Sequence, residues 1–500
     1  MTDPETSTAG KLSTGSPGFD AITNGGLLTG GIYLFAGHPG AGKTILANQV
    51  AFAHAKRGGR VVYGTLLSET HARLLAQVRK LSFFQEAAVG KEIFYLNGLR
   101  AVQNDGLDGL LKAIQRMVRD HDADLVILDG MLQPGQLGVP DLDFKRFIAQ
   151  LQEWIGIVGA TVIMITTNSG KSLPVAEQTM VDGMIELDTE QRELRRHRTL
   201  SVVKYRGSSF NEGRHPYRIT GDGLEIFPRF EASVRTSTPY EASGGGHLPF
   251  GVPGLDDLLG GGIYGGSSTL LLGSSGSGKT TMGLQFLAAG ARRGERGLFF
   301  GFFETPGWLL SKGDGLGLEL TKLRDEGMVD ILWSDTGEPM LDRTLHEITK
   351  RAIDGGVKRV CVDGLAGLRM ADYPERITSA VTVFANHLAA AGITLVLTDE
   401  TRELFVRDIA DPTQHVTTLF HNILFLRSVE LDAELLRLIS VMKGRDGHND
   451  RRLWEVVTGP DGIRLSAPFR REARSLMSGS ATSDVEALQN IASEPKRGSS

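Results

Sequence analysis

Residues 37–44 read GHPGAGKT, and residues 273–280 read GSSGSGKT. Both stretches fit the pattern G-x-x-x-x-G-K-[S/T], in which small residues let the backbone curl so that consecutive N–H groups point at phosphate oxygens. Each stretch follows an apolar run and precedes a segment with helical periodicity, and the N-terminus of a helix adds positive potential to such a loop. The sequence therefore predicts two P-loops that bind ATP.

The two loops supply the residues that we expect to bind ATP and Mg²⁺. Backbone N–H groups surround the phosphates, the lysine reaches the β- and γ-phosphates, and the threonine hydroxyl ligates Mg²⁺. The predicted ATP-binding residues are Gly37, Gly40, Ala41, Gly42, Lys43 and Thr44 in the first loop and Gly273, Gly276, Ser277, Gly278, Lys279 and Thr280 in the second.

The sequence around the loops repeats in the same order. The paired stretches are 15–44 with 251–280, VVYGTLLSET (61–70) with LFFGFFET (298–305), LVILDG (125–130) with RVCVDG (359–364), and SVVKYRG (201–207) with SVMKGRD (440–446). Lys43 precedes Asp129 by 86 residues, and Lys279 precedes Asp363 by 84. An ordered series of matches at near-equal spacing indicates that one domain is duplicated.

Short apolar runs alternate with longer amphipathic segments in each copy, which predicts an α/β fold with a mainly parallel sheet covered by helices on both faces. Ligands of such sheets lie beyond the C-terminal strand ends, where both P-loops fall. We expect strands near 32–36, 61–66, 125–129 and 161–166 and near 269–272, 298–303, 359–363 and 393–398. The predicted divisions are a first domain (11–230), a linker (231–246), a second domain (247–470), and a C-terminal loop with a flexible tail (471–500).

Composition argues against several other classes of protein. Cys361 is the only cysteine, which excludes an intrachain disulfide and suits a reducing cytoplasm. We find no signal peptide and no apolar run of roughly 18–20 residues, so we expect no membrane segment. A formal charge of −5 gives no electrostatic case for nucleic acid. The one dense basic run, QRELRRHRTL (191–200), is interpreted as a solvated hairpin.

Acidic residues follow two strands of each copy. Asp129 and Asp363 each end an apolar strand and are predicted to hold Mg²⁺, the alternative being an aspartate in an ordinary turn. Hydrolysis also needs a carboxylate that positions the attacking water. Glu69 and Glu304 are the catalytic candidates, and solvated glutamates at a helix start are the alternative.

Alternating basic residues recur near the end of each copy. They are Lys204 and Arg206 in KYRG and Lys443 and Arg445 in KGRD. Side chains at i and i+2 on a strand face the same way, so each pair can meet phosphates, and from a neighbouring subunit it can act as an arginine finger. A charged edge strand is the alternative.

Together these motifs resemble the KaiC family of circadian-clock ATPases and autokinases, within the RecA-like superfamily, over roughly 12–480. Outside the P-loops the resemblance is strongest in RTLSVVKYRGSSFNEGRHPYRITGDGLEIFP (198–228). It implies two tandem RecA-like domains, a double-ring homohexamer with ATP between subunits, and a KaiB-like or other regulatory protein partner. It also implies that the four basic residues act in trans, that Ser208 and Thr220 touch nucleotide, and that the C-terminal loop (471–500) is regulatory.

The chain departs from the family where catalysis is expected. The family commonly has two adjacent glutamates after the second strand, the first serving as base; here Ser68 and Phe303 stand in that place. Gly130 and Gly364 replace a hydroxyl residue that tends to follow the strand-ending aspartate. These departures predict slow hydrolysis.

Family kinases phosphorylate neighbouring Ser/Thr residues in the second domain. The matching stretch, 413–426, offers Thr417 and Thr418 as phosphoacceptors, the alternative being two threonines that open a β-rich segment. The leading hypothesis is an ATP-driven timer or signalling switch. A DNA-acting RecA-like recombinase or helicase, and a nucleotide-binding scaffold with little catalysis, are the alternatives.

Overall fold

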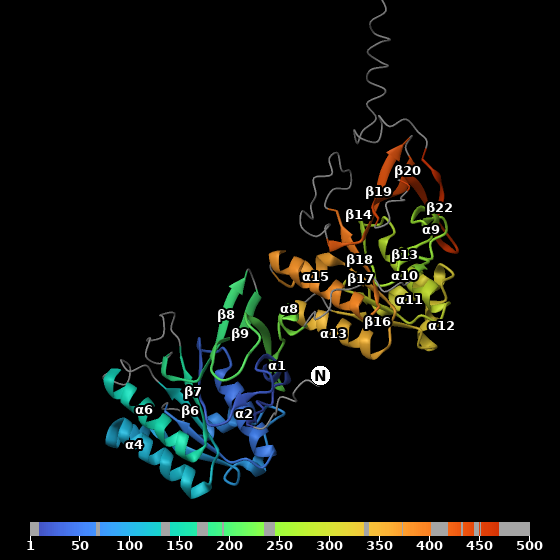
Figure 1. Ribbon diagram of the computed structural model, residues 1–500. Helices are drawn as coiled ribbons and strands as arrows, with labels where there is room; N and C mark the ends of the chain where they lie inside the picture. The colour runs from blue at the N-terminus through green and yellow to red at the C-terminus, as the bar shows by residue number, and fades with distance from the viewer. Residues whose placement is uncertain are drawn as a thin grey trace, which may run out of the picture. The chain divides into compact units, whose positions relative to one another are not determined.

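The computed structural model describes residues 10–66, 71–131, 141–167, 179–192, 195–234, 246–334, 340–372, 374–401, 419–431, 434–444, 450 and 452–469. The chain divides into two compact units, Met1–Ser233 and Val234–Ser500. Each unit contains a nine-stranded sheet (Figure 1). The α/β prediction is confirmed.

The sheet of the first unit has the order β5-β4-β6-β7-β3-β8-β9-β10-β11. From β5 to β8 neighbouring strands are parallel, and from β8 to β11 they are antiparallel. The strands are β3 (Ile32–Gly37), β4 (Val61–Thr65), β5 (Ile93–Asn97), β6 (Leu125–Met131), β7 (Thr161–Thr166), β8 (Gly183–Arg192), β9 (Arg195–Tyr205), β10 (His215–Thr220) and β11 (Gly223–Ile226).

The second unit repeats this order strand for strand, as β16-β15-β17-β18-β14-β19-β20-β21-β22. Its parallel part runs from β16 to β19, and the antiparallel part follows. The strands are β14 (Ser268–Gly273), β15 (Gly297–Gly301), β16 (Val329–Trp333), β17 (Arg359–Asp363), β18 (Thr394–Glu400), β19 (Asn422–Leu431), β20 (Glu434–Lys443), β21 (Trp454–Gly459) and β22 (Gly462–Pro468).

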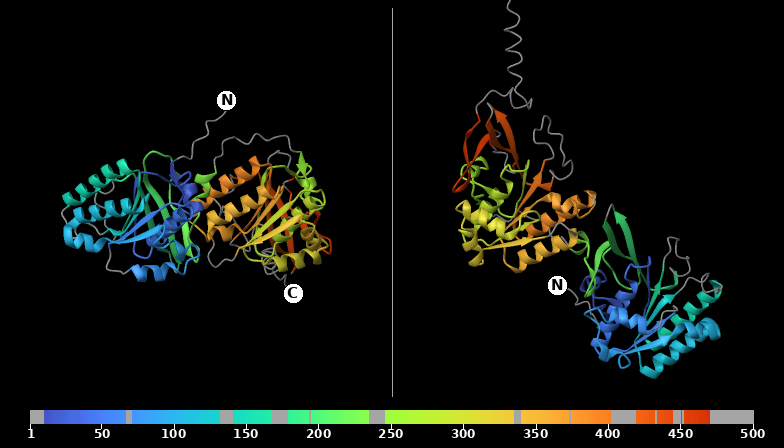
Figure 2. Two further views of the ribbon diagram at one scale, coloured as in Figure 1. Left: turned by 90° about the horizontal axis from the view of Figure 1, so that it is seen from below. Right: turned by 180° about the vertical axis from the view of Figure 1, so that it is seen from behind.

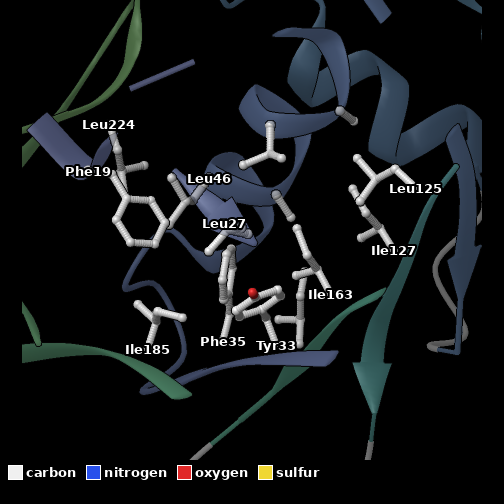
Figure 3. Close-up of a cluster of buried hydrophobic side chains, with 14 of the residues drawn as sticks. Phe19, Leu27, Tyr33, Phe35, Leu46, Leu125, Ile127, Ile163, Ile185 and Leu224 are labelled. Carbon is white, nitrogen blue, oxygen red and sulfur yellow. The ribbon is translucent and has the colours of Figure 1, made fainter. Parts of the chain in front are cut away.

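Helices cover both faces of the parallel strands in the first unit. Successive residues of β3 face opposite ways: Tyr33 and Phe35 join a buried cluster with Leu46 of α2 (Lys43–Lys56), whereas Ile32 and Leu34 join a second cluster with α4 (Gly98–His121) and α6 (Asp141–Val158). Figure 3 shows the first of these clusters. Burial on both faces explains why the strands are apolar throughout.

In the second unit, α10 (Lys279–Ala291) takes the place of α2, and α13 (Leu341–Asp354) and α15 (Pro374–Ala390) lie on the other face (Figure 2). Buried side chains point from nearly every side of α10, because it packs against the sheet and also against β22. The remaining helices are α1 (Pro17–Ile22), α3 (His71–Val78), η1 (Glu86–Ala88), α8 (Phe230–Ser233), α9 (Leu255–Leu258), α11 (Pro306–Gly315), α12 (Leu320–Asp325) and α14 (Leu365–Arg369). Two short ladders pair β1 (Lys11–Leu12) with β2 (Leu27–Leu28) and β12 (His247–Leu248) with β13 (Ile263–Tyr264).

The described residues of the basic run, 191–192 and 195–200, lie on β8 and β9, which pair antiparallel from Gly183↔Tyr205 to Arg192↔Arg195. This agrees with its interpretation as a hairpin. The helix α8 covers the first three residues of the segment predicted as a linker. None of the helices in the described ranges is long and apolar enough to cross a membrane.

Candidate nucleotide-binding sites

Both P-loops leave the C-terminal end of a strand in the middle of the parallel sheet. The first follows β3, between β7 and β8, and the second follows β14, between β18 and β19. The glycine before each lysine is left-handed, with φ of 95° at Gly42 and 107° at Gly278. A Cβ at these positions would also lie 2.9 Å from Ile219 Cδ1 and 2.8 Å from Ile463 Cδ1. Only glycine fits such a turn without strain.

The P-loop lysines are buried and bind their own loops. Lys43 Nζ donates to the carbonyl oxygens of Gly37 and His38, each at 2.8 Å. Lys279 Nζ donates to Gly273 at 2.9 Å and to Ser274 at 2.8 Å. Burial lowers the pKa of both lysines, against the opposing effect of nearby carboxylates. Each ammonium therefore lies inside the cradle where phosphates would bind.

In the first site the strand-ending carboxylate belongs to a buried polar network. Tyr63 Oη donates to Asp129 Oδ2 at 2.9 Å, and Asn48 Nδ2 lies 3.0 Å from the same hydroxyl. Asn48 Nδ2 also donates to the carbonyl oxygen of Thr44 at 2.8 Å. Burial, followed by the charge of Asp129, raises the pKa of Tyr63 well above its ordinary value, so the phenol stays protonated and donates.

In the second site the equivalent carboxylate accepts from two threonines. Thr280 Oγ1 donates to Asp363 Oδ2 at 2.8 Å, and Thr398 Oγ1 donates to Asp363 Oδ1 at 2.5 Å. Thr398 Oγ1 also accepts from the backbone N–H of Gly364 at 2.9 Å. Burial raises the pKa of Asp363, while the two hydroxyl donors lower it.

The second site has donor groups that fit Mg²⁺ and phosphate. The Thr280 hydroxyl and the Asp363 carboxylate are adjacent oxygen ligands of the kind that Mg²⁺ prefers. Within the loop, the buried Oγ atoms of Ser274 and Ser277 have no hydrogen-bond partner among the described residues. Buried hydroxyls of this kind call for a partner, and phosphate oxygens would supply one. Across the described ranges there is no group of three or more His, Cys, Asp or Glu that could hold a metal ion.

In a comparison with known protein families, the chain matches the family model described as "ATPase: KaiC", over residues 12–231 and again over 248–468. The chain belongs to the KaiC family of ATPases. The repeated match also explains the repeated fold, since each unit is one copy of the KaiC ATPase domain.

Individual KaiC relatives match along most of the chain. The circadian clock oscillator protein KaiC of Picosynechococcus sp. is 27% identical over 483 residues, which are 94% of this chain and 92% of the relative. Circadian clock oscillator protein KaiC 1 of Synechocystis sp. is 27% identical over 487 residues, with the same coverage of both chains.

The two catalytic candidates differ in what the structure shows of them. Glu304 follows β15, and its carboxylate accepts from Lys312 Nζ at 3.0 and 3.3 Å. Phe303 is 62% exposed, and its ring lies against Gly364, immediately after Asp363. Ser68 and Glu69 lie outside the described residues. An aromatic ring therefore stands at the position for which the sequence resemblance predicts a base in the second site.

The predicted site residues near the end of the first unit have hydrogen-bond partners within that unit. Lys204 Nζ and Arg206 Nη2 both donate to the carbonyl oxygen of Thr179, at 3.0 and 3.1 Å. Ser208 Oγ accepts from Lys11 Nζ at 3.0 Å, and Thr220 Oγ1 accepts from the N–H of Asp222 at 3.1 Å.

Lys443 is exposed at the end of β20. The three other predicted site residues, Arg445, Thr417 and Thr418, lie outside the described residues.

Sequence reasoning missed several polar residues that surround the two carboxylates. Besides Tyr63, Asn48 and Thr398, the structure brings in Asp399, whose wholly buried carboxylate accepts from Arg369 Nη1 at 2.9 Å and Nη2 at 2.6 Å. The sequence T-D-E (398–400), at the end of an otherwise apolar run, could have indicated that Thr398 and Asp399 lie near the site. Burial raises the pKa of Asp399, and the Arg369 charge opposes that rise.

Proposed function

We propose that this KaiC-family ATPase is a slow, Mg²⁺-dependent enzyme that works as an ATP-driven switch. The observation that carries the proposal is the pairing of two well-formed P-loops with the loss of the usual base. Each buried lysine lies in its loop near a strand-ending carboxylate, yet Phe303 occupies the base position in the second site. Tight nucleotide binding with slow turnover suits a protein whose conformation reports its nucleotide state.

The residues of each site have distinct roles in this proposal. Lys43 and Lys279 leave their own carbonyl partners and bind the phosphates, while the loop N–H groups surround them. Thr280 and Asp363 would hold Mg²⁺ in the second site, and Thr44 and Asp129 in the first. When bound, the ion neutralises negative charge on the phosphates.

The assembly is proposed from the family. We infer a homohexamer in which Lys204, Arg206, Lys443 and Arg445 reach the nucleotide of the adjacent subunit. The printed names of the relatives, circadian clock oscillator proteins, support a timing or signalling role with a protein partner. Light scattering with and without ATP tests the ring, since a monomer in both conditions contradicts it.

Phosphate release tests the enzymatic proposal. We expect slow release from the wild type, a partial loss in Lys43→Ala and in Lys279→Ala, and complete loss in the double variant. Lys112→Ala on α4 and Lys350→Ala on α13 are matched controls, because both lysines are exposed and remote from the loops.

A nucleotide-binding scaffold is the second candidate, and Phe303 is the observation that favours it. It predicts ATP binding that depends on Lys43 and Lys279 without phosphate release that depends on them. The same variants therefore separate the two proposals, provided that binding is measured by equilibrium dialysis alongside release.

Autophosphorylation of Thr417 and Thr418 is a prediction of the family resemblance alone. Intact-mass analysis after incubation with ATP and Mg²⁺, compared with a Thr417→Ala/Thr418→Ala variant, tests it. An unchanged mass while ATP is still present would remove the kinase activity from the proposal.

A further inference from the structure

The strand β18 separates the two functional elements of the second site. It lies between β17, which ends in Asp363, and β14, which leads into the P-loop. The register places Thr398 opposite Asp363 and Glu400 opposite Gly273, the first residue of the loop. The last three residues of β18 therefore border both the carboxylate and the phosphate cradle.

Successive side chains of β18 point to opposite faces of the sheet, so its polar residues have different neighbours. Thr398 contacts Asp363 through its hydroxyl. Glu400 is two residues further on and so faces the same side of the strand, whereas Asp399 faces the other side and pairs with Arg369. Among the acidic groups near Lys279, Glu400 has the largest electrostatic effect on the lysine, ahead of Asp363 and Asp399.

The backbone of Glu400 is held in place while its carboxylate is accessible. The N–H of Glu400 donates to Asp399 Oδ1 at 2.9 Å, and the N–H of the following residue, Thr401, donates to the carbonyl oxygen of Gly273 at 3.2 Å. The Glu400 side chain is exposed and makes no hydrogen bond to any described residue. Glu304, by comparison, is engaged by Lys312.

The first unit lacks this carboxylate. Continuing the register Phe35↔Ile165 by two residues puts Thr167 opposite Gly37, in the position that Glu400 has opposite Gly273. An acidic residue at this register position is therefore present in the second site and not in the first, although the base expected from the family is replaced in both, by Phe303 and by Ser68.

We propose that Glu400 is the catalytic carboxylate of the second site, where it orients the water that attacks the γ-phosphorus of ATP. The water oxygen forms the new bond to phosphorus, the bond to the bridging oxygen of ADP breaks, and the water proton passes through the Glu400 carboxylate to the released phosphate. This inference rests on the proposed hydrolytic function of the second site.

The test uses Lys43→Ala as the parent, so that phosphate release reports the second site alone. We expect Glu400→Gln to slow release by about 100-fold, the lower end of the effect of a general base, and Glu400→Asp to give an intermediate rate. Affinity for a fluorescent ADP analogue should stay within about twofold of the parent, because ADP has no attacking water. Glu347→Gln on α13 is the matched control, since Glu347 is exposed on a helix to which the proposed site assigns no residue.

Each other outcome overturns the inference in a recognisable way. An unchanged rate in Glu400→Gln removes Glu400 from catalysis, and a loss in Glu304→Gln without a loss in Glu400→Gln assigns the role to Glu304. A Glu400→Gln or Glu400→Asp protein with lost ADP affinity or an altered circular dichroism spectrum indicates a structural role. If the Lys43→Ala parent shows no Lys279-dependent release, the proposed function of this site fails together with the inference.

Discussion

The two units share one backbone plan but surround the strand-ending carboxylate differently. In the first, Asp129 accepts from the phenol of Tyr63, which is linked to Asn48. In the second unit, Leu284 takes the position of Asn48, since each follows its P-loop lysine by five residues. Phe299, which lies opposite Cys361 in register, takes the position of Tyr63. Asp363 accepts from threonine hydroxyls instead.

Comparison of the two units separates the residues that both P-loops retain from those that differ around the strand-ending carboxylate. Both units keep the loop glycines, the buried lysine and its two carbonyl partners. The side chains between the sheet and the helix that follows the P-loop differ between the units. Either polar or apolar side chains can fill this space, because a buried polar group is tolerated when it has a hydrogen-bond partner. Substitutions that exchange these surroundings test whether the two sites are functionally distinct.

The largest effect should come from neutralising either carboxylate. We expect Asp129→Asn in a Lys279→Ala parent, and Asp363→Asn in a Lys43→Ala parent, each to slow phosphate release by about two to three orders of magnitude, because an amide binds Mg²⁺ poorly. Asp108→Asn and Asp354→Asn are matched controls at exposed helix positions. An unaffected rate in one of the two variants would show that the corresponding carboxylate has no role in turnover.

The next largest effect is expected from breaking the buried ion pair between Arg369 and Asp399, which has no counterpart among the described residues of the first unit. Arg369→Ala leaves the wholly buried Asp399 carboxylate without its bidentate partner, and we expect about 3 kcal/mol of lost stability. Three of the four tryptophans, Trp308, Trp333 and Trp454, belong to this unit, so urea unfolding followed by tryptophan fluorescence measures it.

Arg324→Ala is the control for that experiment, because Arg324 pairs with Asp325 at an exposed position. We expect a change within about 0.5 kcal/mol. Equal losses in the two arginine variants would mean that the buried pair contributes no more than a surface pair.

A smaller effect should follow from making the first site resemble the second. Tyr63→Phe removes the hydroxyl that Asp129 and Asn48 share, at a cost of about 1–2 kcal/mol. Adding Asn48→Leu to give the Leu/Phe pair of the second unit should recover part of that loss, since no polar group of the pair is then left unpartnered. Hydrogen exchange of the α2 and β4 peptides measures these two variants and Asn48→Leu alone, and a double variant that loses the sum of the two single effects contradicts the network.

The smallest effect is expected from the reverse change in the second site. Thr398→Val removes a hydroxyl that donates to Asp363 and accepts from Gly364, and the first unit has the apolar Ile165 at this register position. We expect about 1 kcal/mol of lost stability and only a few-fold slower phosphate release. A loss of release as large as that of Asp363→Asn would place Thr398 in the chemistry itself.

The sequence predicted those parts of the fold that are marked by a motif or an apolar run within one segment. The loop motifs and the continuous apolar runs of the central strands predicted their positions closely, as at β3, β6 and β17. The edge strands β5 and β16 were missed, because their apolar runs are short, IFYL in IFYLN and ILW in VDILW, and most of their side chains are only half buried.

The surroundings of the sites were less predictable because they depend on topology. Arg369 and Asp399 are 30 residues apart and meet only because β18 lies beside the helix that follows β17. Tyr63 has the appearance of an ordinary strand residue until Asp129 is placed next to it. Glu304 was chosen from its position after a strand, and nothing in the sequence indicated that Lys312 would engage it.

The hydrogen bonds from Lys43 and Lys279 to their own loops have a kinetic consequence. Carbonyl dipoles solvate each buried ammonium, so a phosphate that binds the lysine competes with the loop for the same donor. Association then requires the ammonium to change partners. We therefore expect the rate constant for ATP capture to lie below the diffusion limit and to saturate at high ATP concentration.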